Sequence, residues 1–189
     1  MAKTEPFDNY TFQYEEWFEQ NKIVFESELL AIKRQMPECF NGIEIGAGSG
    51  QFAAPLGIKI GVEPSGKMRE IAQKRGIEVI DGIAESLPFE DSQFDLALMT
   101  TTVCFIDDVD KSFKEAYRVL KSGGVFIIGF IDKESPIGKL YQRHKEENVF
   151  YRLATFRTVD EVVSILKKAG FQSFNFSQTI FHNISVALH

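Results

Sequence analysis

An apolar run that breaks abruptly into glycines constrains the fold of this chain most. Residues 43–50, with the sequence IEIGAGSG, place three glycines at alternate positions directly after a run that contains one carboxylate. Glycine accepts either sign of φ at low cost and lets a ligand approach the backbone closely. A carboxylate inside a sheet is costly without a partner, so Glu44 suits a cationic group. The segment predicts a strand followed by a ligand-binding turn, with an ordinary glycine-rich turn as the alternative.

A second short β-rich run, residues 58–62, ends on Glu63. In doubly wound folds, the acid at the end of the second strand accepts hydrogen bonds from ribose hydroxyls, and a solvated surface acid is the alternative. The glycine spacing then selects the ligand, because a dinucleotide fingerprint needs glycine at the first, third and sixth places. Counted from Gly46, the sixth place is Gln51. We therefore expect a ligand that has a ribose but no pyrophosphate.

The glycine segment resembles motif I of the class I S-adenosylmethionine-dependent methyltransferases. Four later segments match in order: 61–65 resembles the ribose motif, 82–89 the adenine segment, 94–99 the fourth strand, and 116–124 the turn before the fifth. The resemblance covers roughly residues 42–130. It is nearest to the small-molecule methyltransferases of ubiquinone and menaquinone biosynthesis.

The resemblance implies S-adenosylmethionine as the cofactor, S-adenosylhomocysteine as its product, and a cofactor site drawn from these motifs. Its residues would be Glu44, Gly46, Ala47, Gly48, Gly50, Glu63, Pro64, Gly82, Ile83, Ala84, Glu85 and Thr100. Ile83 stands where relatives often carry an aspartate for the adenine amino group. Adenine recognition would then use the backbone of Ile83 and Ala84, with the Glu85 side chain as an alternative partner.

Strand and helix patterns alternate along the chain, which is typical of an α/β protein with helices on both faces of a parallel sheet. We expect a doubly wound, Rossmann-like methyltransferase fold with a mostly parallel sheet of seven strands, or six if the last is incomplete. Helices are predicted over 14–36, 65–75, 107–120 and 158–170, and later strands over 77–80, 125–131 and 171–181. A seventh strand would have to come from residues 184–188.

Length and composition indicate one domain. The 189 residues are 44% hydrophobic, enough for one sizeable core, and no linker-like stretch divides them. Within residues 1–189 we expect an N-terminal helical lid over 1–36, a cofactor-binding core over 42–131, and a substrate-side insertion over 132–156.

The formal net charge of -6 argues against nucleic acid as a partner, because phosphate binding needs clustered basic residues. The exception is a local cluster that we expect on a solvated helix face: Lys67, Arg69, Lys74 and Arg75. Two widely separated cysteines, Cys39 and Cys104, indicate reduced thiols in a cytoplasmic protein. We expect no membrane insertion, because no apolar run has membrane length, and either a monomer or a homodimer.

Candidates for contact with the methyl acceptor lie mainly outside the matched core: Tyr10, Tyr14, Trp17, Thr101, Tyr141 and His144. Core packing of the rings and a solvated position for His144 are the alternatives. We identify no catalytic residue and no metal ligand, because no Ser/His/Asp arrangement or metal-ligand cluster is present. The resemblance implies in-line methyl transfer to a small molecule. A cofactor-binding protein without turnover and a nucleotide-cofactor oxidoreductase are the alternative functions.

Overall fold

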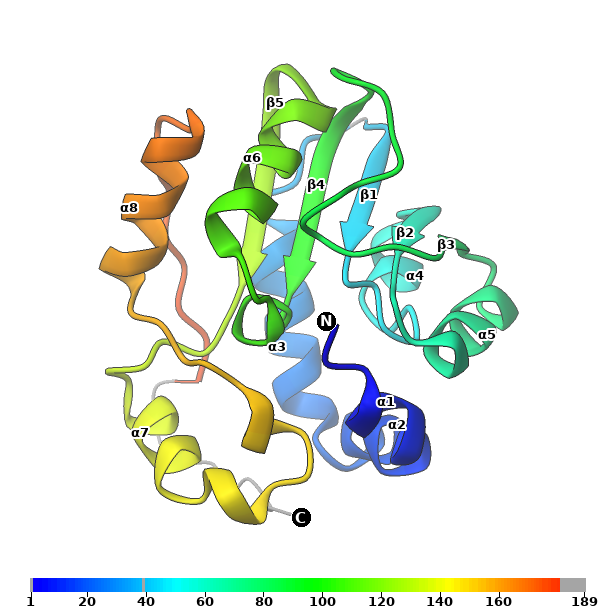
Figure 1. Cartoon of the computed structure of the whole chain (residues 1–189), viewed down its shortest axis with the longest axis vertical. Coiled ribbons are helices and arrows are strands. Elements are labelled where there is room, and N and C mark those ends of the chain that lie inside the picture. The colour runs from blue at the N-terminus through cyan, green and yellow to red at the C-terminus, as the bar shows by residue number, and fades with distance from the viewer. Residues whose placement is uncertain (1, 39, 181–189) are drawn as a thin grey trace.

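A parallel five-stranded sheet forms the centre of the computed structural model, which describes residues 2–38 and 40–180 (Figure 1). Its strands are β1 (Gly42–Ile45), β2 (Ile60–Val62), β3 (Glu78–Ile80), β4 (Phe94–Thr100) and β5 (Leu120–Gly129). The spatial order is β3-β2-β1-β4-β5, and each neighbouring pair is parallel. The order reverses between β1 and β4, so the carboxyl ends of these two strands flank the crevice where doubly wound folds bind ligands.

Helices cover both faces of the sheet. They are α3 (Lys22–Lys33), α4 (Ala53–Leu56) and α5 (Gly66–Lys74) on one face, and α6 (Val109–Val119) and α8 (Val159–Ala169) on the other. Successive residues of β4 alternate between the two hydrophobic clusters: Leu96 and Leu98 pack toward α3, and Ala97 and Met99 toward α6. Burial on both faces explains why the central strands are almost wholly apolar.

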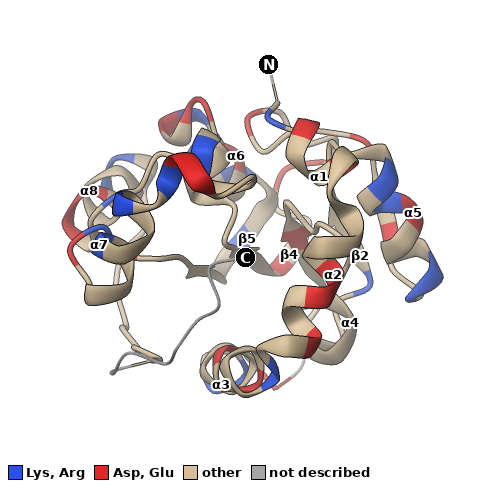
Figure 2. Cartoon of the chain, turned by 90° about the horizontal axis from the view of Figure 1, so that it is seen from below, with Lys and Arg blue, Asp and Glu red and all other residues tan. Residues whose placement is uncertain are grey.

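The remaining elements gather at the carboxyl ends of the strands. They are α1 (Glu5–Asn9), α2 (Thr11–Gln20), α7 (Pro136–Arg143) and three short 3-10 helices, η1 (Val103–Phe105), η2 (Lys145–Glu147) and η3 (Tyr151–Leu153). Seen from below, α1 and α2 on one side, α3, and α7 on the opposite side surround the ends of β4 and β5 (Figure 2). Helices from the N-terminal region and from the segment after β5 therefore surround the carboxyl ends of the strands.

Side-chain caps fix three of the helix starts that the sequence predicts. Ser65 at α5, Asp108 at α6 and Thr158 at α8 each accept a hydrogen bond from a backbone N–H of the first turn. At α8 the cap is reciprocal, because Glu161 accepts from the backbone N–H of Thr158. The helix ends at Gly170, whose φ of +110° suits glycine.

The sheet has five strands in the described residues, so the expectation of seven, or six, is wrong there. The strand expected over 171–181 does not form in its described part, residues 171–180, which make no strand pairing. Its rings pack sideways instead: Phe171 lies 5.2 Å from the Tyr117 ring and 5.3 Å from the Phe126 ring, centroid to centroid. The segment therefore packs through its rings against α6 and β5 and does not add a strand to the sheet. Residues 184–188 lie outside the described residues.

The single helix expected over 14–36 is two helices, α2 and α3, and α2 begins earlier, at Thr11. They break at Asn21, whose backbone has φ of -111° and whose amide Nδ2 donates to the Trp17 carbonyl at 2.9 Å. An asparagine side chain that bonds to the preceding turn competes with the helix ladder, which explains the break. None of the helices in the described ranges is both long and apolar enough to span a bilayer.

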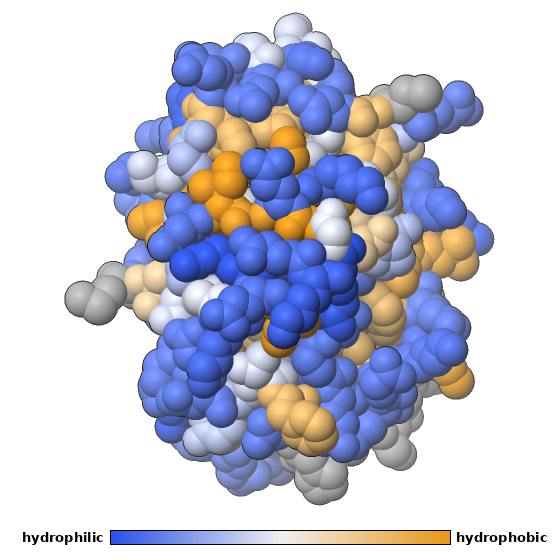
Figure 3. All heavy atoms as spheres, turned by 90° about the vertical axis from the view of Figure 1, so that its right-hand side faces the viewer, coloured by the Kyte–Doolittle hydropathy of each residue, from blue (hydrophilic) through white to orange (hydrophobic). Residues whose placement is uncertain are grey.

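The basic cluster on α5 is only partly the solvated face that we expected. Lys67 and Lys74 are exposed, and the surface on this side of the molecule is mostly hydrophilic (Figure 3). Arg69, however, donates to the carbonyls of Glu63 and Pro64 at 2.8 and 2.9 Å. Arg69 is therefore a structural residue that fixes the turn after β2, and Arg75 has a comparable role described below.

Candidate cofactor and acceptor site

The turn after β1 is a cradle that only glycine can form. Gly46 and Gly48 have φ of +71° and +54°, a region that other residues rarely adopt. A Cβ on Gly46 would overlap the side chain of Thr102, and a Cβ on Gly48 would lie 3.0 Å from the hydroxyl of Tyr14. The backbone conformation and the close approach of Thr102 and Tyr14 therefore both require glycine at these two positions, which line the cavity described below.

Glu44 is buried directly beneath this turn, with 2% of its surface exposed. Its Oε1 accepts a hydrogen bond from the Thr100 hydroxyl at 3.4 Å, and its Oε2 has no hydrogen-bond partner among the described residues. Burial raises the pKa of Glu44 to about 8. The backbone N–H of Ala53 and the Thr100 hydroxyl act against this shift, but no cation does. The buried carboxylate therefore fits the cationic group predicted for it, such as the ammonium of the expected cofactor.

Glu63 joins the glycine turn to the start of α5. Its Oε2 accepts from the backbone N–H of Gly48 at 3.0 Å, and its Oε1 accepts from the N–H of Ser65 at 2.8 Å. Burial raises the pKa of Glu63, while these two N–H groups act in the opposite direction. Each carboxylate oxygen keeps a further lone pair, so this fixed side chain can still accept hydrogen bonds from two ribose hydroxyls.

Glu85, on the side of the cleft expected to hold adenine, also fixes a neighbouring loop. Its Oε1 accepts from the backbone N–H groups of Asp107 and Asp108 at 3.1 and 3.3 Å, which fastens the loop that leads into α6. The Ile83 side chain is 39% exposed and its carbonyl accepts from the N–H of Ser86 at 3.1 Å. Glu85 is thus held at the cleft by contacts that leave its other oxygen available.

A cavity of about 1600 Å³ runs from the glycine cradle past the ends of β4 and β5, and continues along β5 between α8 and residues 171–180. The predicted site residues that line it are Gly46, Gly48, Glu63, Pro64, Gly82, Ile83, Ala84, Glu85, Thr100, Tyr14, Trp17, Thr101 and Tyr141. The structure therefore brings together residues from all the matched motifs up to β4, from α2 and from α7 around one space.

Five of the predicted site residues do not line this cavity: Glu44, Ala47, Gly50, Tyr10 and His144. Glu44 lies behind the turn, as described. The Ala47 side chain packs against Gly61 on β2, so closely that a Cβ on Gly61 would lie 2.7 Å from it. Gly50 lies against Ala72 and Ile77. These contacts give Ala47 and Gly50 a packing role in the turn.

Two of the residues proposed for the acceptor side lie apart from the cavity. His144 follows the end of α7, where its Nδ1 lies 3.1 Å from the Glu147 carboxylate, as for a partly solvated residue. The Tyr10 ring lies 6.4 Å from the ring of Phe150. Phe150 itself lines the cavity, so Tyr10 supports the wall from behind.

The acceptor side of the cavity has an aromatic wall built from three segments that are far apart in the sequence. The Phe7 ring lies 5.1 Å from that of Phe105 and 5.7 Å from that of Phe150, and the Tyr14 ring lies 6.0 Å from Phe150. Phe105 in turn stacks on Tyr151 at 6.0 Å. Phe105 and Phe150 were not among the predicted residues. Their signal in the sequence was their position just after β4 and within the insertion over 132–156.

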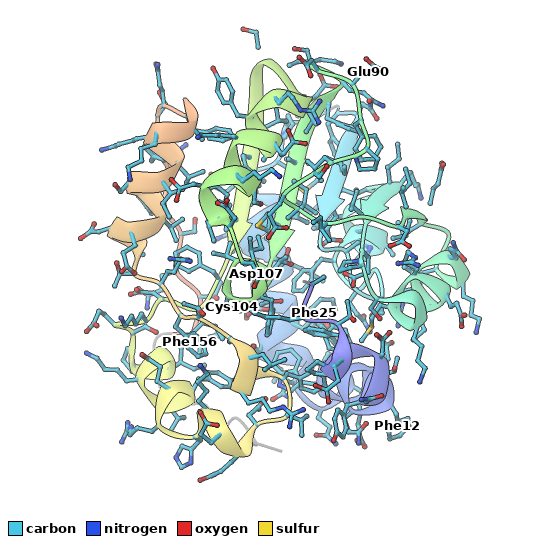
Figure 4. The ribbon with its side chains drawn as sticks, viewed as in Figure 1. Phe12, Phe25, Glu90, Cys104, Asp107 and Phe156 are labelled. Carbon is cyan, nitrogen blue, oxygen red and sulfur yellow. The ribbon has the colours of Figure 1, made fainter. Side chains whose placement is uncertain are left out.

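Figure 4 separates the inner from the outer aromatic residues of this region. Phe12 lies on the outer side of α2 and is exposed, whereas Cys104 and Phe156 lie below the end of β4. Cys104 is a free thiol whose Sγ donates to the Thr101 carbonyl at 3.4 Å, and burial raises its pKa to about 12. Cys39 lies outside the described residues. Of the α2 rings, Tyr14, Trp17 and Phe18 line the cavity and Phe12 does not.

Polar contacts hold α1 and α2 over the cradle. Asp8 accepts a hydrogen bond from the Ser65 hydroxyl at 2.6 Å. Glu15 forms an ion pair with Arg75, which also donates to the carbonyl of Ser49 at 2.7 Å. These partners are separated by more than 50 positions for Asp8 and Glu15, so no local pattern in the sequence could indicate them.

Residues 43–128 match the family model of a methyltransferase domain. A crystal structure from Thermotoga maritima, described as an S-adenosylmethionine-dependent methyltransferase and possible histamine N-methyltransferase, is 49% identical to this chain. The similarity covers 90% of this chain and 82% of that one, with a TM-score of 0.87.

Two further relatives are known from sequence. An uncharacterized protein of Methanocaldococcus jannaschii is 46% identical over 178 residues, which are 94% of this chain and 86% of that protein. The ubiquinone/menaquinone biosynthesis C-methyltransferase of Haemophilus ducreyi is 30% identical over 145 residues, or 65% of this chain and 54% of that enzyme. The first similarity extends along nearly the whole chain, whereas the second involves about half of the relative.

Proposed function

Because this chain belongs to the S-adenosylmethionine-dependent methyltransferases, which use that compound as methyl donor, we propose that it methylates a small molecule held beneath α1 and α2. The observation that carries the proposal is the position of Glu63. Its carboxylate joins the Gly48 turn to α5 at the wall of a cavity that continues, past Tyr14, to an aromatic acceptor side. One space can therefore hold both a nucleoside and a second ligand.

When bound, S-adenosylmethionine supplies a methyl carbon made electrophilic by a positively charged sulfur. The chain contributes binding and orientation. Glu44, behind the turn, would balance the positive charge of the cofactor ammonium. Glu63 would accept hydrogen bonds from the ribose hydroxyls, and Gly46 and Gly48 line the cavity that would hold the ligand. Orientation of two reactants in an enclosed site can lower a barrier by roughly 7 to 11 kcal/mol.

The surroundings of the acceptor also favour loss of charge at sulfur. Rings of Phe7, Tyr14, Phe105 and Phe150 line the space, and α1 and α2 are tied down over it. An apolar site that excludes water disfavours the charged sulfonium relative to the transition state, in which that charge is dispersed. Enclosure under a lid also favours a small acceptor over a folded protein or a nucleic acid, and so does the net charge of -6.

Calorimetric titration of the purified protein with S-adenosylhomocysteine tests the cofactor part of the proposal. We expect binding of one molecule per chain, and no binding at millimolar ligand would contradict the site. Incubation with labelled S-adenosylmethionine and a metabolite extract then tests turnover. Transfer of label to a small molecule supports the proposal, whereas cofactor binding without any labelled product would favour the non-turnover alternative.

The oxidoreductase alternative conflicts with family membership. It also conflicts with the local geometry: the sixth place of the glycine motif is Gln51, whose amide donates to the Glu15 carboxylate at 3.1 Å. That residue serves the attachment of α2 and does not leave the bare backbone that a pyrophosphate needs.

A further inference from the structure

Glu28 is a charged residue of the cavity wall that the cofactor site does not use. It lies on α3, is half-buried and lines the cavity. No hydrogen bond or ion pair to Glu28 occurs within the described part of the chain. Glu26, on the same helix, is exposed instead and lies 3.8 Å from the ammonium of Lys22. Glu26 and Glu28 are thus two positions apart on α3, but only Glu28 faces the cavity.

Two tyrosines of the acceptor side, Tyr141 and Tyr151, line the same cavity as Glu28. Its negative charge, after burial, contributes to the raised pKa values of Tyr141 and Tyr151, so the carboxylate and both phenols share one region. The rings of these tyrosines lie 4.7 Å apart, and Phe105 stacks on Tyr151. Neither phenol makes a hydrogen bond to another described residue. The polar groups of this region are therefore left for a ligand.

This position is unfavourable for a carboxylate in the absence of a ligand. Burial raises the pKa of Glu28 to about 7, and no basic side chain acts against that shift. A buried carboxylate is stabilised best by a cation that also brings hydrogen-bond donors. A neutral hydroxyl would supply a hydrogen bond but would leave the charge unbalanced.

The charge of the whole cavity points to the same class of ligand. Its lining contains six acidic side chains and only two basic ones, and the acids are Glu28, Glu63, Glu85, Asp107, Asp108 and Asp132. The two basic residues are Lys3 and Lys111, and Lys3 is paired with Asp107 at 3.1 Å. A concave surface with this excess of acid attracts cations and repels anions.

We propose that Glu28 determines acceptor specificity, by pairing with an ammonium group of the acceptor in the part of the cavity that Tyr141 and Tyr151 also line. The inference rests on the proposed methyltransferase function and assigns its acceptor class, an aromatic-sized primary amine. Aromatic faces add a favourable interaction with a cation within about 6 Å of the ring centre. The carboxylate supplies the charge and the rings exclude water from the pair.

Calorimetric titration of the protein saturated with S-adenosylhomocysteine tests this assignment. The probes are 2-phenylethylamine, which is cationic at pH 8, and 2-phenylethanol, its neutral counterpart of the same shape. We expect the amine to bind at least tenfold more tightly than the alcohol. Glu28→Gln should lower the amine affinity at least tenfold and leave alcohol binding unchanged. Glu26→Gln is the matched control and should change neither.

Equal binding of the two probes, no binding of the amine, or full amine affinity in Glu28→Gln would each overturn the proposal. The affinity for S-adenosylhomocysteine is measured in the same samples, so a failure of the cofactor site is distinguished from a failure of this inference. The wild type provides a second test without any substitution. Its amine affinity should rise between pH 6 and pH 8 as Glu28 ionises, because Tyr141 and Tyr151 stay neutral there. A flat profile would contradict the role of Glu28.

Discussion

The hydroxyl of Tyr14 lies 3.0 Å from the position that a Cβ on Gly48 would occupy. This relationship places α2 directly on the glycine turn, so the lid and the cradle share one wall. Burial raises the pKa of Tyr14, and the carboxylates of Glu44 and Glu63 raise it further. Tyr14 is therefore a neutral hydrogen-bond donor near both of the acids that we expect to bind the cofactor.

Substitution Gly48→Ala should weaken binding of S-adenosylhomocysteine at least tenfold, because the new methyl group would occupy the space beneath the Tyr14 hydroxyl. Gly57→Ala is the matched control, since Gly57 also has a positive φ, of +77°, but has no neighbour within 4 Å of its Cβ position. Both changes should reduce stability by roughly 1 to 2 kcal/mol through backbone strain. Only Gly48→Ala should lower the affinity measured by calorimetry.

The double variant Tyr14→Phe with Gly48→Ala separates crowding from strain. Removal of the hydroxyl should restore part of the lost affinity, because the nearest atom to the added methyl is then absent. Affinity that stays as low as in Gly48→Ala alone would mean that the methyl group obstructs the ligand itself rather than Tyr14.

Glu63→Gln should lower the affinity for S-adenosylhomocysteine by roughly 1.5 to 3 kcal/mol, the usual contribution of a hydrogen bond to a charged group. A glutamine also cannot accept from both Gly48 and Ser65, because one of its two terminal atoms is a donor. Glu78→Gln, at an exposed position on β3, is the control and should bind normally. Wild-type affinity in Glu63→Gln would remove Glu63 from the ribose site.

Release of the lid can be followed through Arg75, which ties Glu15 on α2 to the carbonyl of Ser49. Arg75→Gln should increase hydrogen exchange of the amides in α1 and α2 and should accelerate cofactor dissociation, because these helices cover the cleft. Lys74→Gln, at the exposed neighbouring position, is the control and should change neither the exchange rate nor the dissociation rate. Unchanged exchange in Arg75→Gln would show that the remaining contacts, such as Asp8 with Ser65, suffice to hold the lid.

The parts of the fold that depend on local chemistry were predictable. The family followed from five motifs and is confirmed, and capping residues such as Ser65 and Asp108 marked helix starts correctly. The cofactor contacts of Glu44 and Glu63 stay predictions, although the structure places both acids at the glycine turn. Their signal was strong because the strand, the turn and the acid follow one another directly in the chain.

Features that depend on distant partners were not predictable in the same way. A strand was predicted over residues 171–181, but a strand needs a partner backbone, and Phe171 packs on Tyr117 instead. The roles of Glu15 and Glu28 were not predicted, because an acidic residue on a helix is usually expected to face the solvent. Only the packing of α2 and α3 over the strand ends reveals that these two face inward.

Buried acids should give the ligand-free protein an unusual dependence of stability on pH. The pKa of Glu44 rises from 4.5 to about 8 and that of Glu28 from 4.5 to about 7 on folding. The folded state therefore binds more protons than the unfolded state between these limits, and the free energy of unfolding should fall as the pH rises through that window. For Glu44, which is almost fully buried, the loss is on the order of 5 kcal/mol.

Chemical denaturation between pH 4.5 and pH 9 measures this effect. Glu44→Gln should be more stable than the wild type at pH 9 and should show a smaller decline with pH, while Glu78→Gln should follow the wild type. Saturation with S-adenosylhomocysteine should also flatten the decline, because a cation paired with Glu44 favours its ionised form. A wild-type profile that is level over this range, or a decline that persists fully in Glu44→Gln, would mean that Glu44 is ionised and compensated in the folded protein. The same result would contradict its assignment as the partner of an incoming ammonium.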